Sequence, residues 1–263
     1  MYGAIIGDVV GSPYEFSRNK RKDFMPLFHP KGGITDDTIM TVAIADSLMN
    51  EIHPAEAMRS WARRVYPTES LGGYGQGFIK WLSAPTVQPP YNSYGNGSAM
   101  RISPAGWLYD DLAVALEVAK IVTEVSHSHP EGVKGAQAVV LAIYLARKGS
   151  EPNAIREAVT EMFGYDLDRD VDTCRAIHTY NETCQGCVPD ALICAFEATS
   201  FEDAIRNAVS LGGDADTLAA ITGSVAEALF GIPDDLIGEV RAYLKPDLKP
   251  VLSQFYALIG DVK

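Results

Sequence analysis

The chain has 263 residues, of which 47% are hydrophobic and 21% are charged, and this balance indicates a folded, water-soluble protein rather than a disordered one. The formal net charge of −12 argues against a nucleic-acid partner, because phosphate backbones are bound chiefly by clustered Lys and Arg side chains. A small anion could still bind locally.

The first expected element is a helix in the N-terminal stretch GAIIGDVVGSPYE. Gly3, Gly7 and Gly11 recur in it every four residues, so this helix would present a bare stripe against which a second helix can pack closely. Glu15 falls just past its end, at the start of a loop. That loop holds the only basic run of this acidic chain, RNKRK at 18–22, which is usually a solvated segment but here could close over a phosphate.

Helical periodicity continues along most of the chain. Apolar residues at spacings of three and four predict helices at 36–50, 53–66, 110–126, 130–149, 153–165, 200–213 and 215–231. Asp36, Asp110 and Ser200 stand where helix N-caps are expected. Alternating strand patterns are scarce, and no repeat or low-complexity linker divides the sequence. We therefore predict an all-α fold, with one compact multi-helix domain over residues 1–263.

Four cysteines lie in one short region, at Cys174, Cys184, Cys187 and Cys194. The CQGC pair could form half of a zinc site, but the spacing matches no strong zinc signature, so we expect free or buried thiols. Nothing indicates an oxidising compartment in which they would pair. The N-terminus has no basic segment, and Asp8 interrupts its apolar run, so we expect no signal peptide, no membrane anchor and a cytoplasmic protein.

Two helix starts, TDDT and GGDADT, carry more carboxylates than a helix cap requires. Together they supply the oxygen-bearing side chains of Thr35, Asp36, Asp37, Asp214, Asp216 and Thr217. One such site alone would be interpreted as an N-cap, because Thr and Asp accept hydrogen bonds from free helix N–H groups. Two sites that face one another would instead concentrate negative charge, which Mg²⁺ or Mn²⁺ neutralises through oxygen ligands. We therefore predict a centre that holds two such ions.

Four motifs occur in a fixed order, GAIIGDVVGSPYE, GITDDT, GNGSAMR and GGDADT, and the ordered set resembles the ADP-ribosylglycohydrolase family from Gly3 to about Gly231. The resemblance implies an all-α, orthogonal multi-helix domain with a dinuclear Mg²⁺ or Mn²⁺ centre that removes ADP-ribose from a modified partner. It implies metal ligands at Glu15, Thr35, Asp36, Asp37, Asp214, Asp216 and Thr217. None of these positions departs from the family pattern, which argues against an inactive relative.

The motif YGNGSAMR fits a ligand that carries a pyrophosphate. As the resemblance implies, the successive N–H groups of Asn96, Gly97 and Ser98 could form a phosphate nest, although the motif on its own would be a plain Asn-Gly turn. Tyr94 precedes this loop and could stack on adenine, or be an exposed turn residue. His127 is a substrate-site candidate because the family places a histidine in a similar segment, whereas a histidine at a helix boundary is more often structural.

The resemblance implies that a glycosidic bond is hydrolysed through an oxocarbenium-like transition state. Glu15 is our candidate to orient or deprotonate the attacking water, and Asp37 is the second choice. We expect the substrate to be an ADP-ribosylated protein or a small ADP-ribose conjugate, the product to be ADP-ribose, and the enzyme to be a monomer. The family favours the bond to arginine, with the serine link and the ester of O-acetyl-ADP-ribose left open.

Two other functions stay open at this point. A Mg²⁺-dependent prenyl synthase is disfavoured, because its aspartate-rich motif needs a further Asp three residues after the pair, where this chain has Met40. A non-catalytic ADP-ribose reader or a crystallin-like structural relative would keep the fold and the ligand site without turnover. Release of ADP-ribose from a modified substrate distinguishes the enzyme from both.

Overall fold

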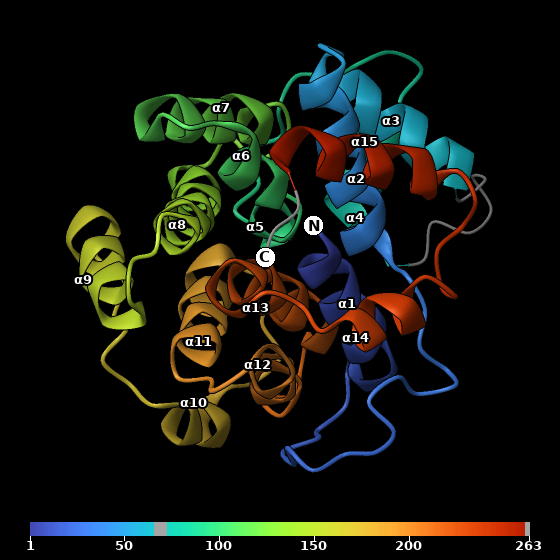
Figure 1. Cartoon of the computed structure of the whole chain (residues 1–263). Helices are drawn as coiled ribbons and strands as arrows, with labels where there is room; N and C mark the ends of the chain where they lie inside the picture. Colours follow the sequence, from blue (N-terminus) through green and yellow to red (C-terminus); the bar gives the residue numbers. More distant parts are fainter. Residues whose placement is uncertain (66–72, 261–263) are drawn as a thin grey trace.

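The computed structural model describes residues 1–65 and 73–260. Within these residues the regular secondary structure is helical, with two isolated β-bridges and no strand (Figure 1). The helices are α1 (Tyr2–Gly11), η1 (Ser12–Tyr14), α2 (Asp36–Met49), α3 (Pro54–Val65), α4 (Gln76–Ser83), α5 (Gly97–Met100), α6 (Ser103–Leu108), α7 (Leu112–Glu124), α8 (Pro130–Arg147), α9 (Pro152–Phe163), α10 (Val171–Ile177), α11 (Cys184–Phe196), α12 (Phe201–Val209), α13 (Ala215–Phe230), α14 (Asp234–Val240) and α15 (Leu248–Ile259). The predicted all-α fold class is confirmed.

Every helix predicted from the periodicity has a counterpart, although two of the predicted caps are wrong by one residue. Ser200 caps α12 as expected, through a hydrogen bond of 3.1 Å from a main-chain N–H of the first turn. Thr35 rather than Asp36 caps α2, and Asp111 rather than Asp110 caps α7. The side chains of Asp36 and Asp110 therefore make no capping bond, and Asp36 lines a pocket.

The helices that the periodic pattern did not predict are mostly short or interrupted. Helix α5 has four residues, too few for a periodic face to be recognised. Helix α11 contains Pro189, a residue type that normally ends a helix because it lacks the backbone N–H. Burial of α11 along almost its whole length therefore overrides its weak local preference.

The glycine stripe of α1 packs directly on the backbone of α13. A Cβ atom at Gly7 would lie 2.0 Å from the carbonyl oxygen of Ala219, and one at Gly3 would lie 2.1 Å from that of Gly223. These separations are far below van der Waals contact, so only glycine permits the crossing. The predicted close approach of two helices is thus confirmed, and it brings the last turns of α1 against the first turn of α13.

Helix α13 lies near the centre of the fold, and α8 contacts both α13 and the outer helix α9 (Figure 1). The Ala-rich sequences of α8 and α13 are buried on more than one side. All four cysteines are free and buried, as predicted. Among the described helices, none is both long and apolar enough to cross a membrane. The assignment of one domain to residues 1–263 stays a prediction, and it includes positions 66–72 and 261–263, which lie outside the described residues.

Candidate active site

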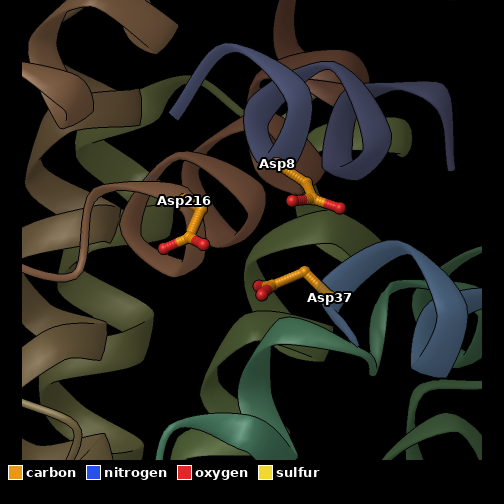
Figure 2. Close-up of side chains that lie close together, drawn as sticks. All are labelled: Asp8, Asp37 and Asp216. Atoms are coloured by element: carbon orange, nitrogen blue, oxygen red, sulfur yellow. The ribbon is translucent and has the colours of Figure 1, made fainter. Parts of the chain in front are cut away.

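Three helix ends bring buried carboxylates together at one place in the fold. Asp8 lies in α1, Asp37 in the first turn of α2 and Asp216 in the first turn of α13, and Figure 2 shows the three side chains pointing toward one another. Carboxylate oxygens of these residues lie within 4.8 Å of one another. Oxygens of Glu15, Asp214 and Asp216 form a second group of the same spacing, so Asp216 belongs to both. The two helix starts singled out in the sequence therefore face one another.

Asp8 is a site residue that the sequence analysis did not identify. Its fully buried carboxylate accepts hydrogen bonds from the N–H and hydroxyl of Thr35, at 2.9 and 2.8 Å, and from the N–H of Thr38 at 3.1 Å. The available signal was the charge itself, because an aspartate inside an apolar helix needs buried partners. Asp8 thereby holds the first turn of α2 against α1.

Helix capping does not account for the paired aspartates. Asp214 precedes α13 but makes no capping bond, and its Oδ2 atom accepts instead from the side-chain amide of Asn96 at 2.6 Å. Thr35 caps α2, so neither Asp36 nor Asp37 is needed there. The Oδ1 atom of Asp37 is buried and has no hydrogen-bond partner among the described residues. An unpartnered buried carboxylate oxygen is costly, which marks this position as one where a cation fits.

Thr35 of the first motif and Thr217 of the second both contact Asp37. The hydroxyl of Thr35 lies 3.2 Å from its Oδ2 atom, and the hydroxyl of Thr217 lies 3.4 Å from the same atom. Before α13, Gly212 and Gly213 adopt positive φ angles of 72° and 77°, which residues with a Cβ rarely adopt. The glycine pair thus forms the tight turn that orients the GGDADT motif toward the TDDT motif.

Burial raises the pKa of the carboxyl groups in this cluster, and neighbouring negative charges raise most of these pKa values further. The pKa of Asp8 rises to about 6 and that of Glu15 to about 7. The pKa is also raised for Asp36, Asp37, Asp214 and Asp216. A divalent cation would stabilise the ionised forms, and the all-oxygen donor set is the kind that Mg²⁺ and Mn²⁺ prefer. The residues therefore fit a hard divalent cation.

A pocket of about 610 Å³ opens over the carboxylates, and this volume is typical of small-molecule sites. The predicted site residues that line it are Glu15, Asp36, Asp37, Asn96, Gly97, His127, Asp214, Asp216 and Thr217. Thr35, Tyr94 and Ser98 are described residues that do not line it. The fold thus gathers most of the predicted residues around one cavity, while their functional roles stay predictions.

The loop that contains Asn96 is tied into the protein by its own backbone. The N–H of Asn96 donates to the carbonyl of Glu182 at 2.8 Å, and the N–H of Ser98 points to the carbonyl of Gly95 at 3.4 Å. The Ser98 hydroxyl is buried and donates to the carbonyl of Gly132 at 2.8 Å. Two of the three N–H groups of the expected phosphate nest therefore have main-chain acceptors within the protein, and the nest stays a prediction.

His127 and Tyr94 differ in their surroundings. His127 is buried, with Nδ1 2.8 Å from the hydroxyl of Ser126, and burial together with the charge of Arg101 holds its pKa well below the usual value. Its Nε2 atom faces the Asn-Gly loop, since a Cβ at Gly97 would lie 3.3 Å from it. Tyr94 is 46% exposed. A neutral imidazole thus borders the pocket, whereas Tyr94 is exposed and its ring contacts His129.

Four pocket residues outside the predicted site set add a positive charge and an aromatic rim. The guanidinium of Arg101 is fully buried and keeps its charge at neutral pH, although burial lowers its pKa to about 10. Phe16 and Tyr180 stack with ring centroids 5.2 Å apart, and they are 71% and 43% exposed. Glu182 joins them in the pocket lining. These residues come from loops, where no periodic signal marks a function.

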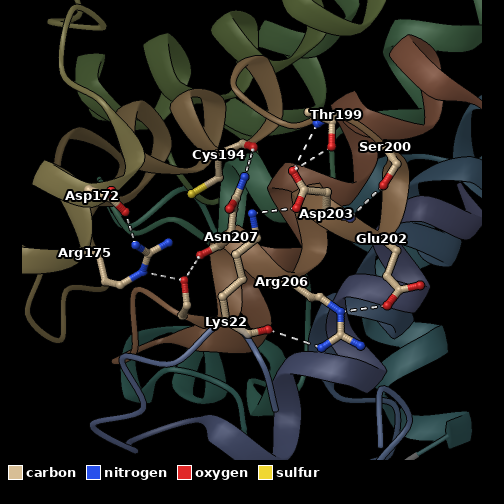
Figure 3. Close-up of polar contacts among 11 residues, drawn as sticks. Lys22, Asp172, Arg175, Cys194, Thr199, Ser200, Glu202, Asp203, Arg206 and Asn207 are labelled. Carbon is tan, nitrogen blue, oxygen red and sulfur yellow. Dashed lines mark hydrogen bonds and ion pairs between the residues drawn. The ribbon is translucent and has the colours of Figure 1, made fainter. Parts of the chain in front are cut away.

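The basic run at 18–22 makes internal contacts instead of closing over the pocket. Arg21 pairs with Asp23 at 2.7 Å, and Lys22 pairs with Asp203 of α12 at 2.5 Å (Figure 3). The ammonium of Lys20 donates to two main-chain carbonyls. Lys20 and Lys22 thus fasten the loop to α12 and to the segments that follow α10 and α12.

Without a divalent cation, the protein is expected to lose stability as the pH rises. The folded-state pKa values of Asp8 and Glu15, about 6 and about 7, lie above the usual values of 3.8 and 4.5. At pH values between the usual and the raised pKa of each group, the folded state binds more protons than the unfolded state. The free energy of unfolding therefore falls as the pH rises through this range. In EDTA we expect the melting temperature to drop by roughly 5 °C or more between about pH 5 and about pH 8. Saturating Mg²⁺ should abolish most of the drop, and a flat profile in EDTA would contradict this account.

The chain resembles proteins of one family along almost its whole length. A family model described as ADP-ribosylglycohydrolase matches residues 1–262. ADP-ribosylhydrolase ARH3 of Mus musculus is 25% identical, over 88% of this chain and 82% of its own length. ADP-ribosylarginine hydrolase Tri1 of Pseudomonas putida (strain GB-1) is 26% identical, over 88% of this chain and 70% of its own. A solved structure described as an ADP-ribosylglycohydrolase-related protein complex has the same fold, with a TM-score of 0.71 at 23% identity, covering 98% of this chain and 96% of that one.

Proposed function

Because the chain belongs to the ADP-ribosylglycohydrolase family, we propose that it removes ADP-ribose from modified proteins by hydrolysing the N-glycosidic bond to arginine. The observation that carries this proposal is the two clusters of carboxylates that share Asp216, because all their members except Asp8 line a pocket of about 610 Å³. A carboxylate cluster in a cavity of this size suits a sugar that is held by its hydroxyls. We further propose that the protein acts as a cytoplasmic monomer.

We propose that two Mg²⁺ or Mn²⁺ ions bind here. The ligands would be Glu15, Thr35, Asp36, Asp37, Asp214, Asp216 and Thr217, in keeping with the unpartnered Oδ1 atom of Asp37. When bound, the ions supply Lewis-acid polarisation and hold the distal ribose. Asp8 is assigned a positioning role, because its oxygens already accept hydrogen bonds from Thr35 and Thr38.

Glu15 is the proposed general base. It is half-buried and lines the pocket, and a bound divalent cation would keep its carboxylate ionised, which is the form that accepts a proton from water. Asp37 is the second candidate. Positive charge that develops at the anomeric carbon would be stabilised by the carboxylates that surround it, which is the electrostatic requirement of glycosidic cleavage.

The ADP half of the substrate would extend across the pocket toward its cationic side. Arg101 lines the pocket with a buried positive charge, which suits a pyrophosphate. The proposed contacts in this region are Tyr94, Asn96, Gly97, Ser98 and His127. For Ser98, which is buried, the contribution would be the conformation of the loop rather than direct contact.

The preference for arginine is supported by aromatic and acidic residues of the pocket lining. Phe16 and Tyr180 present exposed aromatic rings there, and the carboxylates of Glu15 and Glu182 lie in the same lining. Aromatic faces together with carboxylates form a favourable environment for a planar guanidinium. One relative, Tri1, carries the name ADP-ribosylarginine hydrolase.

The test is release of ADP-ribose from matched peptides that carry the sugar on arginine or on serine, each with Mg²⁺ and with EDTA. We expect release from the arginine peptide to depend on Mg²⁺ and to exceed release from the serine peptide by at least about tenfold. Faster release from the serine peptide would reassign the linkage. Failure to cleave either peptide, with ADP-ribose still bound, would favour a non-catalytic reader.

A further inference from the structure

The loop between α10 and α11, at 178–183, joins the two sides of the pocket. The ring of Tyr180 stacks on Phe16, whose N–H donates to the carbonyl of Gly213 at 2.9 Å. The carbonyl of Glu182 accepts the N–H of Asn96 at 2.8 Å. Both Tyr180 and Glu182 line the pocket, so the placement of this loop sets the shape of the pocket mouth.

His178 anchors this loop from behind. Its imidazole is 2% exposed, and the Nδ1 atom lies 2.7 Å from Oδ2 of Asp190, a buried residue of α11. Asp190 also receives the guanidinium of Arg169 at 2.8 Å, and these two partners lower its pKa although burial opposes this. An ionised carboxylate only accepts hydrogen bonds, so Nδ1 of His178 is the donor.

The main chain of His178 makes the second half of the anchor. Its carbonyl oxygen accepts the ammonium of Lys20 at 2.9 Å, and the same ammonium donates to the carbonyl of Leu211. Lys20 follows Glu15 and Phe16 in the chain, and Leu211 precedes the turn to Asp214. His178 and Lys20 thus connect the buried carboxylate of Asp190 with the segments that carry Glu15 and Asp214.

The other imidazole nitrogen of His178 has no role in this network. Nε2 is buried and has no hydrogen-bond partner among the described residues. Only the Nδ1 donor therefore carries the contact, and an asparagine side chain can place an amide donor at a similar position. The substitution His178→Asn therefore keeps the hydrogen bond to Asp190 while removing the imidazole ring.

We propose that His178 is a positioning residue, which holds Tyr180 and Glu182 in place for substrate binding through its Nδ1 bond to Asp190 and its carbonyl bond to Lys20. The part of this proposal that concerns substrate rests on the proposed function. The part that concerns the loop does not, since order in 178–183 can be measured without any substrate.

The experiment compares His178→Ala with His178→Asn. In His178→Ala we expect KM for the arginine-linked peptide to rise on the order of tenfold while kcat stays within about twofold, because the mouth is loosened but the carboxylates are untouched. Amides at 179–183 should exchange hydrogen about tenfold faster in the same variant. His178→Asn should restore both values to within about twofold of wild type. Lys22→Met is the matched control in the basic run, since Lys22 pairs with Asp203 instead, and it should leave both unchanged.

Three outcomes would overturn the proposal. Unchanged exchange at 179–183 in His178→Ala would show that the loop does not depend on the anchor. Equal impairment of the alanine and asparagine variants would assign the effect to ring packing rather than to the Nδ1 bond. A fall in kcat at constant KM would show that His178 affects the chemical step rather than substrate binding. If wild type cleaves no peptide, the proposed function fails, and hydrogen exchange still decides the role of His178.

Discussion

Replacement of Asp216 by asparagine is expected to reduce ADP-ribose release on the order of 10³-fold at saturating Mg²⁺. Asp216 is the one residue whose oxygens belong to both carboxylate groups, so this substitution removes a charged ligand from each. An amide oxygen is a weaker ligand for a hard cation than a carboxylate. The measurement is single-turnover release from the arginine-linked peptide, with metal concentration varied to separate weak binding from lost chemistry.

The same variant has a second signature in the absence of substrate. Burial and the charges of Asp37 and Asp214 raise the pKa of Asp216, so removing its charge should stabilise the metal-free protein in EDTA at neutral pH. Mg²⁺ should raise the melting temperature of wild type and have little effect on Asp216→Asn. The control is Asp203→Asn, outside the pocket, which should retain activity. Wild-type turnover by Asp216→Asn would contradict the proposed centre.

Replacement of Gly7 by alanine is expected to lower the free energy of unfolding by about 3 kcal/mol. The added Cβ would lie 2.0 Å from the carbonyl oxygen of Ala219, and neither backbone can yield unless α1 and α13 move apart. Helix propensity alone predicts the opposite sign, because alanine favours a helix by about 1 kcal/mol over glycine. Separation of the helices would also move Asp8 away from Asp216, so activity should fall together with stability.

Denaturation by urea measures this effect, with Gly238→Ala as the matched control. Gly238 lies inside helix α14, and no described atom would come within 4 Å of a Cβ placed there. The control should therefore be neutral or stabilised by up to about 1 kcal/mol. Equal stabilities for the two variants would show that the α1–α13 crossing can relax, and that the glycine stripe is not required.

The expected results for Asp216→Asn and Gly7→Ala both connect the charges of the carboxylate cluster with the stability of the protein. Carboxylates with raised pKa values are an arrangement that stability alone would not favour, because each ionised group destabilises its neighbours. The close crossing of α1 and α13 holds them together nonetheless. The scaffold thus maintains a cluster that a cation, rather than the protein, would neutralise.

The sequence by itself determined the helical fold class and the position of the main helices, because apolar spacing of three and four depends only on local geometry. It also determined that the N-terminal helix would pack closely, since glycines every four residues lie on one face. The ordered motifs were sufficient to indicate the family. That the two aspartate motifs face one another was only a condition of the metal-site prediction, because spacing along the chain could not demonstrate it.

Only the tertiary structure decided which groups meet across long separations in sequence. Asp8 acquires its role from hydrogen bonds to Thr35 and Thr38, and Asp214 from the amide of Asn96. Lys20 and Lys22 of the basic run turn inward because acceptors on α12 and in the loop after α10 are within reach. Such contacts depend on how helices cross, and the crossing depends on backbone separations of a few ångströms that no local pattern encodes. For this reason the sequence identified the ligand types, and the fold decided how they are arranged.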